Sequence, residues 1–187
     1  MDLNNKLKGI PKVNFFNLDN RTDRRTWMVN QFKKYGIEYN RVSGTKFLAR
    51  KKEEWMHLIA DIEDYKLLWP IAANAVSHLD FLKSWYANTK EPYVFLMEDD
   101  YDLGLIPYWH FDWQYMMDHI PYDWDCIHLG FENPDGMSFH LHPIEAAHDF
   151  GPVILKREYV EKLLDLHCIG DKYKLVNTVA NAAWNRQ

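Results

Sequence analysis

The opening of the chain has the order strand, helix, strand, and this order constrains the fold more than any other feature. Residues 13–18 are short and apolar and predict a first strand, and residues 37–42 predict a second. Between them, residues 20–23 supply helix-start chemistry, and Gly36 supplies a helix end. The intervening helix places three large side chains on one face: Met28, Phe32 and Tyr35. Two strands joined by a helix favour an α/β fold with a mostly parallel sheet.

A second segment contains a cluster of acidic residues directly after a predicted strand. Residues 93–97 are apolar and β-prone, and they lead directly into four carboxylates: Glu98, Asp99, Asp100 and Asp102. Clustered carboxylates repel one another unless a cation or basic residues neutralise them. Oxygen ligands at the rim of a sheet suit Mg²⁺ or Mn²⁺, with substrate phosphates completing the coordination. The alternative is an acidic, solvated turn, and this segment alone leaves both interpretations open.

The rest of the chain alternates helical and strand-like patterns without a clear domain boundary. We therefore expect one domain over residues 1–187. The expected helices are 46–68, ending before Pro70, then 74–88, 109–120 and 158–166, and the expected strands are 124–130 and 152–155. Residues 131–149 are rich in Asn, Pro, Gly and His, and are long enough to suggest a functional loop.

Composition excludes several classes of protein. The chain of 187 residues is 47% hydrophobic and 26% charged, which is neither disordered nor membranous. A net charge of −5 makes nucleic acid an unexpected partner. Cys126 and Cys168 fit neither a disulfide framework nor a metal motif, and are expected to be small core residues. We see no apolar signal segment or membrane span, so a soluble protein of the cytoplasm is expected.

The motifs, taken in order, resemble glycosyltransferase family 25, the lipopolysaccharide-type and procollagen-type galactosyltransferases. That family's pattern runs I-N-L-D-R-x-x-D-R-R, then S-H-L, then L-E-D-D, then W-D-x-x-x-L-G. This chain has Asn17-Leu18-Asp19 with Arg21-Thr22-Asp23-Arg24-Arg25, then Ser77-His78-Leu79, then Leu96-Met97-Glu98-Asp99-Asp100, then Trp124-Asp125 and Leu129-Gly130. The resemblance covers residues 13–166 in order. It implies a GT-A-like, Rossmann-like three-layer sandwich with a donor half at about 11–130 and an acceptor-side half at about 131–187.

The chain also departs from that pattern. Residues 72–78 stand where the family has E-x-G-C-x-x-S-H, and residues 149–157 stand where it has a Y-G-x-x-A-Y-x-x-S-R-like strand. Asn177 lies near the position of an expected acid. The second and third departures lie in the acceptor-side half, so the donor half is the better supported half.

Four polar residues at the exit of the first strand are donor-site candidates: Asn17, Asp19, Arg21 and Arg25. An α/β sheet binds a nucleotide there, with Asn or Asp available to a base or ribose and Arg to phosphate. The alternative is a helix cap with solvated arginines, which suits Asp23, while Arg24 fits either interpretation. The resemblance adds His78, Glu98 and Asp99 to the donor site.

The resemblance also suggests metal ligands and a base. Asp100 is the leading ligand for Mn²⁺ or Mg²⁺, and Asp102 offers a second D-x-D frame. His148, from a cluster with His140 and His142, could complete the ion's coordination, although polar loop histidines explain the cluster as well. Asp149 and Glu145 are the candidate catalytic bases.

The sequence thus predicts a metal-dependent glycosyltransferase for lipopolysaccharide-type biosynthesis. The resemblance implies inverting transfer of a hexose from a UDP-sugar, galactose first and glucose second, to a glycan hydroxyl or, as a second option, a protein side chain. One alternative is a non-catalytic nucleotide-sugar or glycan-binding module. Another is a metal-dependent phosphohydrolase or nucleotidyltransferase that uses the same acidic strand end.

Overall fold

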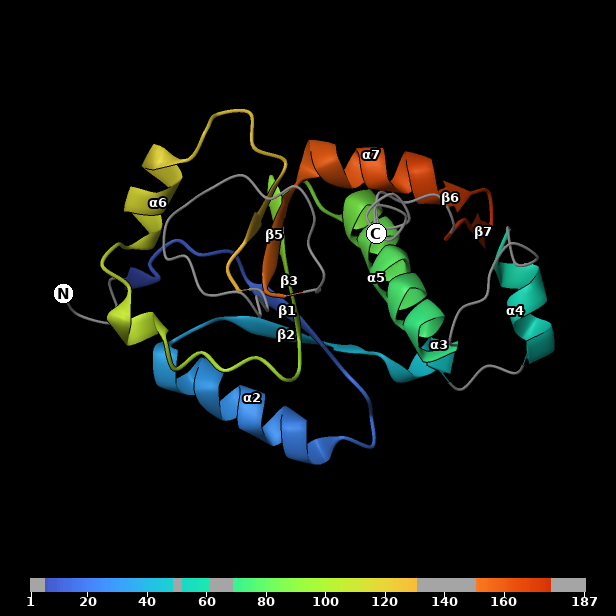
Figure 1. The fold of residues 1–187 in the computed structure, drawn as a ribbon, viewed down its shortest axis with the longest axis horizontal. Helices are drawn as coiled ribbons and strands as arrows, with labels where there is room; N and C mark the ends of the chain where they lie inside the picture. Colours follow the sequence, from blue (N-terminus) through green and yellow to red (C-terminus); the bar gives the residue numbers. More distant parts are fainter. Residues whose placement is uncertain (1–5, 49–51, 61–68, 131–150, 176–187) are drawn as a thin grey trace, which may run out of the picture. The chain divides into compact units, whose positions relative to one another are not determined.

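The computed structural model describes residues 6–48, 52–60, 69–130 and 151–175 of the 187 (Figure 1). The chain folds into two compact units, each made of two separate segments. Unit 1 comprises Met1–Val42 and Pro92–Lys156, and unit 2 comprises Ser43–Glu91 and Arg157–Gln187. This division does not test the prediction of a single domain with a donor half and an acceptor-side half. Both stay predictions.

The central sheet has five strands in the order β2-β1-β3-β5-β4. Their bounds are β1 (Val13–Asn17), β2 (Tyr39–Ser43), β3 (Tyr93–Glu98), β4 (Cys126–His128) and β5 (Val153–Lys156). β1 and β3 are parallel neighbours, whereas β5 is antiparallel to both β3 and β4. The predicted α/β class is confirmed, and the sheet is mixed, because β5 runs against β1, β3 and β4.

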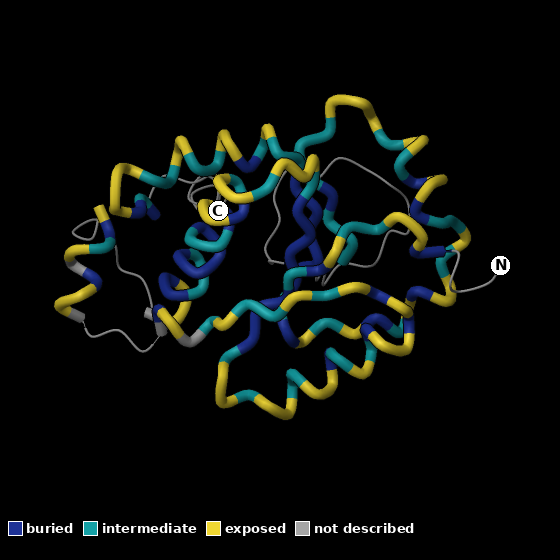
Figure 2. The backbone as a smooth tube through the Cα atoms, turned by 180° about the vertical axis from the view of Figure 1, so that it is seen from behind, coloured by how far each residue is buried: buried dark blue, intermediate teal, exposed yellow. Residues whose placement is uncertain are grey.

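One face of this sheet forms the core of unit 1. Alternate residues of β1 and β3 point to it, namely Val13, Phe15, Phe95 and Met97. Helix α2 (Thr22–Tyr35) covers them with Met28, Phe32 and Tyr35, as the sequence predicted. The rings of Phe15 and Phe32 have centroids 5.3 Å apart, within the range of favourable aromatic contacts. Figure 2 shows the central strands mostly in dark blue, the colour of buried residues.

Helix α2 ends as its sequence predicts. Gly36 adopts the left-handed conformation, with φ of 66°, and its N–H donates to carbonyls of the last turn. A residue with a side chain would be strained there, so glycine terminates the helix at low cost. Helix α6 (Trp113–His119) contributes to the same buried cluster as α2. The described residues of unit 1 therefore show two helices that share one buried cluster with the sheet, and the three-layer GT-A arrangement stays a prediction.

Two helix predictions are corrected in detail. The helix expected over 109–120 begins only at Trp113, because Asp112 caps it by accepting a hydrogen bond from Tyr115 N at 2.8 Å. A short 3₁₀ helix, η2 (Ile106–Tyr108), comes before it. Pro70 does not separate two helices. It lies in the first turn of α5 (Trp69–Asn88), where a missing N–H costs no helical hydrogen bond.

Unit 2 has its own core around α5. Residues predicted as one helix over 46–68 form α3 (Thr45–Leu48) and α4 (Lys52–Leu58) within the described part. Helix α7 (Arg157–His167) follows the predicted 158–166 closely. It leads into a hairpin, β6 (Cys168–Ile169) and β7 (Lys172–Tyr173), that the sequence pattern did not predict. The largest fully buried side chains of this core are Trp55, Ile59 and Val76.

Both cysteines are free and half-buried, and burial raises the pKa of both thiols. This agrees with the expected packing role. No helix among the described residues is long and apolar enough to cross a bilayer. The predicted loop at 131–149 lies outside the described residues.

Candidate functional site

The parallel register of β1 and β3 brings two predicted site residues together. Phe16 is opposite Glu98, so the next pair along the strands is Asn17 and Asp99. Asn17 Nδ2 donates to Asp99 Oδ2 at 2.6 Å, and the two residues are only 2% and 7% exposed. Because side chains alternate along a strand, both lie on the face of Phe15 and Met97. A buried amide–carboxylate pair therefore ends the apolar core at the carboxyl edge of the sheet.

Arg24 supplies the positive charge that this carboxylate needs. It lies in the first turn of α2, and its Nη1 donates to Asp99 Oδ1 and to Asp100 Oδ2, at 3.0 Å each. The hydrogen bond to Asp99, with the charges of both carboxylates, raises the pKa of Arg24. The acidic strand end is thus balanced by an arginine, so charge repulsion by itself does not require a cation here.

A second arginine approaches the same pair from β2. Arg41 Nε donates to Asn17 Oδ1 at 3.0 Å, and Arg41 Nη2 donates to the Asn17 carbonyl at 3.2 Å and to Asp19 Oδ1. Asn17 also donates to the Arg21 carbonyl at 3.0 Å, which fixes the turn between β1 and α2. We call this set of residues the rim network: Asn17, Asp19, Arg24, Arg41, Asp99 and Asp100. It joins three adjacent strands and the start of α2.

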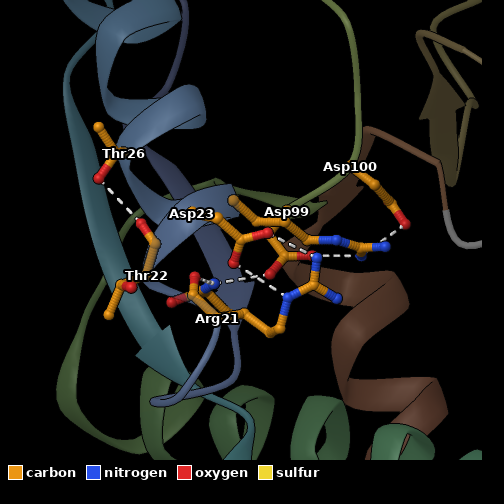
Figure 3. Close-up of polar contacts among 8 residues, drawn as sticks. Arg21, Thr22, Asp23, Thr26, Asp99 and Asp100 are labelled. Atoms are coloured by element: carbon orange, nitrogen blue, oxygen red, sulfur yellow. Dashed lines mark hydrogen bonds and ion pairs between the residues drawn. The ribbon is translucent and has the colours of Figure 1, made fainter.

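The other two predicted arginines lie next to the rim network with weaker attachments. Arg21 forms a fork with Asp23, through Nε to Oδ1 at 3.0 Å and Nη2 to Oδ2 at 2.8 Å (Figure 3). This fork holds the pKa of Asp23 well below its usual range. Asp23 is therefore an ion-pair partner within α2, and the helix has no side-chain cap. Arg25 Nη2 donates to the Asp19 carbonyl at 3.3 Å.

Two predicted acids have different surroundings. Asp102 Oδ1 accepts a hydrogen bond from Gly104 N at 2.8 Å, which closes a small turn after β3. Glu98 is the last residue of β3 and is half-buried, with its side chain on the sheet face opposite Asp99. Within the described ranges, no three His, Cys, Asp or Glu side chains converge as a metal cage would.

Asp100 nevertheless fits a cation that substrate phosphates help to hold. Its side chain is 49% exposed, and Oδ2 is the oxygen that meets Arg24. Oδ1 accepts no hydrogen bond from the residues that the structure describes. Mg²⁺ and Mn²⁺ sites commonly use one or two carboxylates together with phosphate oxygens and water. The exposed carboxylate of Asp100 is therefore compatible with a hard cation, and its predicted role as a metal ligand stays a prediction.

His78 lies in unit 2, on α5, next to Ser77, whose Oγ donates to the Ala73 carbonyl at 2.7 Å. His78 is 4% exposed, and burial lowers its pKa from 6.5 to about 4. A neutral histidine at physiological pH suits packing inside the unit. Its predicted place in the donor site stays a prediction.

This burial predicts how stability changes with pH. Between pH 6.5 and about 4 the unfolded chain binds a proton at His78 and the folded protein does not. Stability should therefore fall as the pH is lowered through this range, by up to about 1.4 kcal/mol per pH unit. Urea unfolding at several pH values measures the slope, which should be shallower in His78→Gln. The exposed His110→Gln should keep the parent slope, and an unchanged slope in His78→Gln would rule out this origin.

From the sequence, Arg24 stayed open between two interpretations and Arg41 was not predicted at all. The one signal for Arg41 was a charged side chain inside a predicted strand, residues 37–42, next to the strand that carries Asn17. Gln31 was also missed, and it fixes the segment after β3. The candidate bases Asp149 and Glu145 and the candidate ligand His148 lie outside the described residues. No protein-family model and no curated protein matches this chain.

Proposed function

We propose that the rim network binds the nucleotide diphosphate of a UDP-sugar and that the chain is a metal-dependent hexosyltransferase. One observation supports this most. The carboxyl ends of two parallel strands hold Asn17 and Asp99 in contact, with the first turn of α2 beside them. Open α/β sheets bind their ligands at the carboxyl ends of strands, and helix starts favour anionic groups.

Each part of the donor has a suitable group. Asp19, at the surface beside Asn17, can accept hydrogen bonds from a ribose or a base. Arg21, Arg24 and Arg25 lie at the start of α2, where guanidinium groups can contact phosphate oxygens through two parallel hydrogen bonds. Asp100 would hold Mn²⁺ or Mg²⁺ against the same phosphates.

The proposed transfer inverts the anomeric centre and needs two kinds of help. A base must take the proton from the acceptor hydroxyl, and positive groups must stabilise the departing diphosphate. The arginines of α2 supply the second function, and a bound cation would add a Lewis acid to it. Asp149 and Glu145 stay the proposed bases. Galactose is the proposed hexose before glucose, and a glycan hydroxyl the proposed acceptor.

Incubation with a panel of nucleotide sugars and Mn²⁺, followed by measurement of released nucleotide, tests the activity. Release from UDP-galactose or UDP-glucose supports the proposal. Binding of UDP-sugar without release or transfer would instead identify a binding module. Cleavage of nucleotides that carry no sugar would favour a phosphohydrolase.

Arg25 gives a specific prediction. Arg25→Ala should weaken UDP binding by tenfold or more while the melting temperature stays nearly constant. Losing a hydrogen bond to a charged phosphate costs about 1.5–3 kcal/mol, whereas the contact to the Asp19 carbonyl is surface-exposed. Calorimetric titration and thermal unfolding measure the two effects. Lys33→Ala, in the last turn of the same helix, is the control and should change neither. A lower melting temperature with unchanged UDP affinity would make Arg25 structural.

A further inference from the structure

Unit 1 contains a pocket of about 220 Å³ that the rim network does not use. Its floor is the helix-covered face of the sheet, where Val13, Phe95 and Met97 are at most 2% exposed. Protein interiors rarely contain spaces much larger than a water molecule. An apolar pocket with a few polar groups at its edge is characteristic of small-molecule sites, and this one is smaller than the roughly 300–1,000 Å³ of pockets for drug-sized ligands.

The segment that follows β3 forms one wall of the pocket, and it is fixed from two directions. Gln31 on α2 donates to the Tyr101 carbonyl at 3.0 Å and accepts from Leu103 N at 2.7 Å. Lys6, which is 5% exposed, donates from Nζ to the Pro107 carbonyl at 2.8 Å and to the Trp109 carbonyl. This wall is therefore ordered before any ligand binds. The free energy of binding then contains no entropic cost for ordering it.

Asp102 is the charged residue that lines the pocket. It lies at the exposed end together with Leu105, and Gly104 N holds its Oδ1 in place. A Cβ added at Gly104 would lie 3.0 Å from that oxygen, so glycine permits the close turn. A fixed carboxylate at the mouth accepts hydrogen bonds and repels anions. It therefore selects a neutral or cationic molecule that carries a donor group.

We propose that this pocket binds a small aromatic or alicyclic alcohol, with its ring on the sheet face and its hydroxyl donating to Asp102. The volume suits a single substituted ring, since an apolar cavity of about 150 Å³ engineered in another protein binds benzene. Trp109 and Tyr101 supply aromatic contacts at the side of the pocket.

The pocket lies close to the rim network along α2. Gln31, which holds the pocket wall at Tyr101 and Leu103, is seven positions from Arg24 on this helix, which corresponds to about 10 Å. An alcohol held there would present its hydroxyl near the proposed donor, and the alcohol would then be an acceptor. This last step rests on the proposed function, whereas binding to the pocket does not.

Fluorine NMR of the full chain without any nucleotide tests the pocket directly. Three probes of similar shape distinguish the roles of the hydroxyl, the ring and a negative charge: 4-fluorophenol, fluorobenzene and 4-fluorobenzoate. We expect 4-fluorophenol to bind saturably with a Kd below about 1 mM, fluorobenzene severalfold more weakly and the benzoate at least tenfold more weakly. Absence of saturable binding by 4-fluorophenol, or equal binding by the benzoate, would overturn the proposal.

Variants locate the binding. Ile10→Trp fills the pocket from its half-buried wall, and Leu105→Trp covers its exposed mouth, so each should weaken 4-fluorophenol binding at least tenfold. Leu105 is 51% exposed, so its variant should fold even if Ile10→Trp does not. Ile71→Trp adds the same ring at an exposed position of unit 2 and should bind as the parent does.

Asp102→Asn should remove the discrimination against benzoate. Parent-like binding in Leu105→Trp would place the probe elsewhere. UDP titration of the same variants separates failure of this proposal from failure of the proposed function.

Discussion

Replacing Asp99 by alanine is expected to lower the free energy of unfolding by about 3 kcal/mol. The carboxylate accepts hydrogen bonds from Asn17 at 2.6 Å and from Arg24 at 3.0 Å, and the residue is 7% exposed. Alanine removes both acceptors, and each hydrogen bond to a charged group contributes about 1.5–3 kcal/mol. Arg24 would keep its ion pair with Asp100. The loss should therefore be about 3 kcal/mol, the sum of the lower values for the two hydrogen bonds. Urea unfolding monitored by circular dichroism measures it.

Two further variants test the cause of this loss. Asp99→Asn preserves the shape but places an amide N–H₂ against either Asn17 Nδ2 or Arg24 Nη1, so it should also destabilise the protein. Asp118→Ala removes an exposed carboxylate on α6 and should change the free energy by less than about 0.5 kcal/mol. If Asp99→Asn were as stable as the parent, the two donor contacts would not be the source of stability.

Gly151→Ala should have the largest effect on folding. A Cβ at this position would lie 2.1 Å from the Gly130 carbonyl oxygen and 3.1 Å from Tyr101 Oη. No rotamer relieves this clash, because the nearest atom belongs to the backbone. The backbone at Gly151 or Gly130 would have to shift, which we expect to cost about 3–5 kcal/mol and to lower the melting temperature by roughly 10 °C.

Gly130→Ala is the matched control for this prediction. Its Cβ would meet Pro152 at 3.4 Å and Tyr101 at 3.8 Å, which are close to ordinary contacts. In thermal unfolding, the melting temperature of Gly130→Ala should therefore be close to that of the parent, and the melting temperature of Gly151→Ala should be much lower. Equal melting temperatures for the two alanine variants would show that the close approach of Gly151 to Gly130 is not required.

Local patterns predicted the first part of the fold well. The spacing of Met28, Phe32 and Tyr35 identified the buried face of α2, and Gly36 identified its end, because both depend on neighbouring residues. The boundaries of α5 and α6 were less predictable. Pro70 is compatible with a first turn as well as with a break, and Asp112 competes with upstream residues as a cap.

Long-range contacts were predicted only in part. The sequence placed polar side chains at the carboxyl ends of β1 and β3, but it did not predict that these two strands are neighbours. The sequence did not specify that β5 lies between β3 and β4 and runs against them, since strand order depends on tertiary packing. For the same reason Arg41 was missed, as its partners Asn17 and Asp19 are more than 20 positions away.

Calorimetric titration of the parent protein with UDP, in Mn²⁺ and again with a chelator, tests the central claim most directly. The rim network should bind UDP in Mn²⁺, and removing the ion should weaken binding at least tenfold. Asp100→Ala should bind UDP weakly under both conditions, because it lacks the proposed ligand. Equal affinity with Mn²⁺ and with chelator would contradict the metal's role, and absence of UDP binding in Mn²⁺ would contradict the proposed donor site itself.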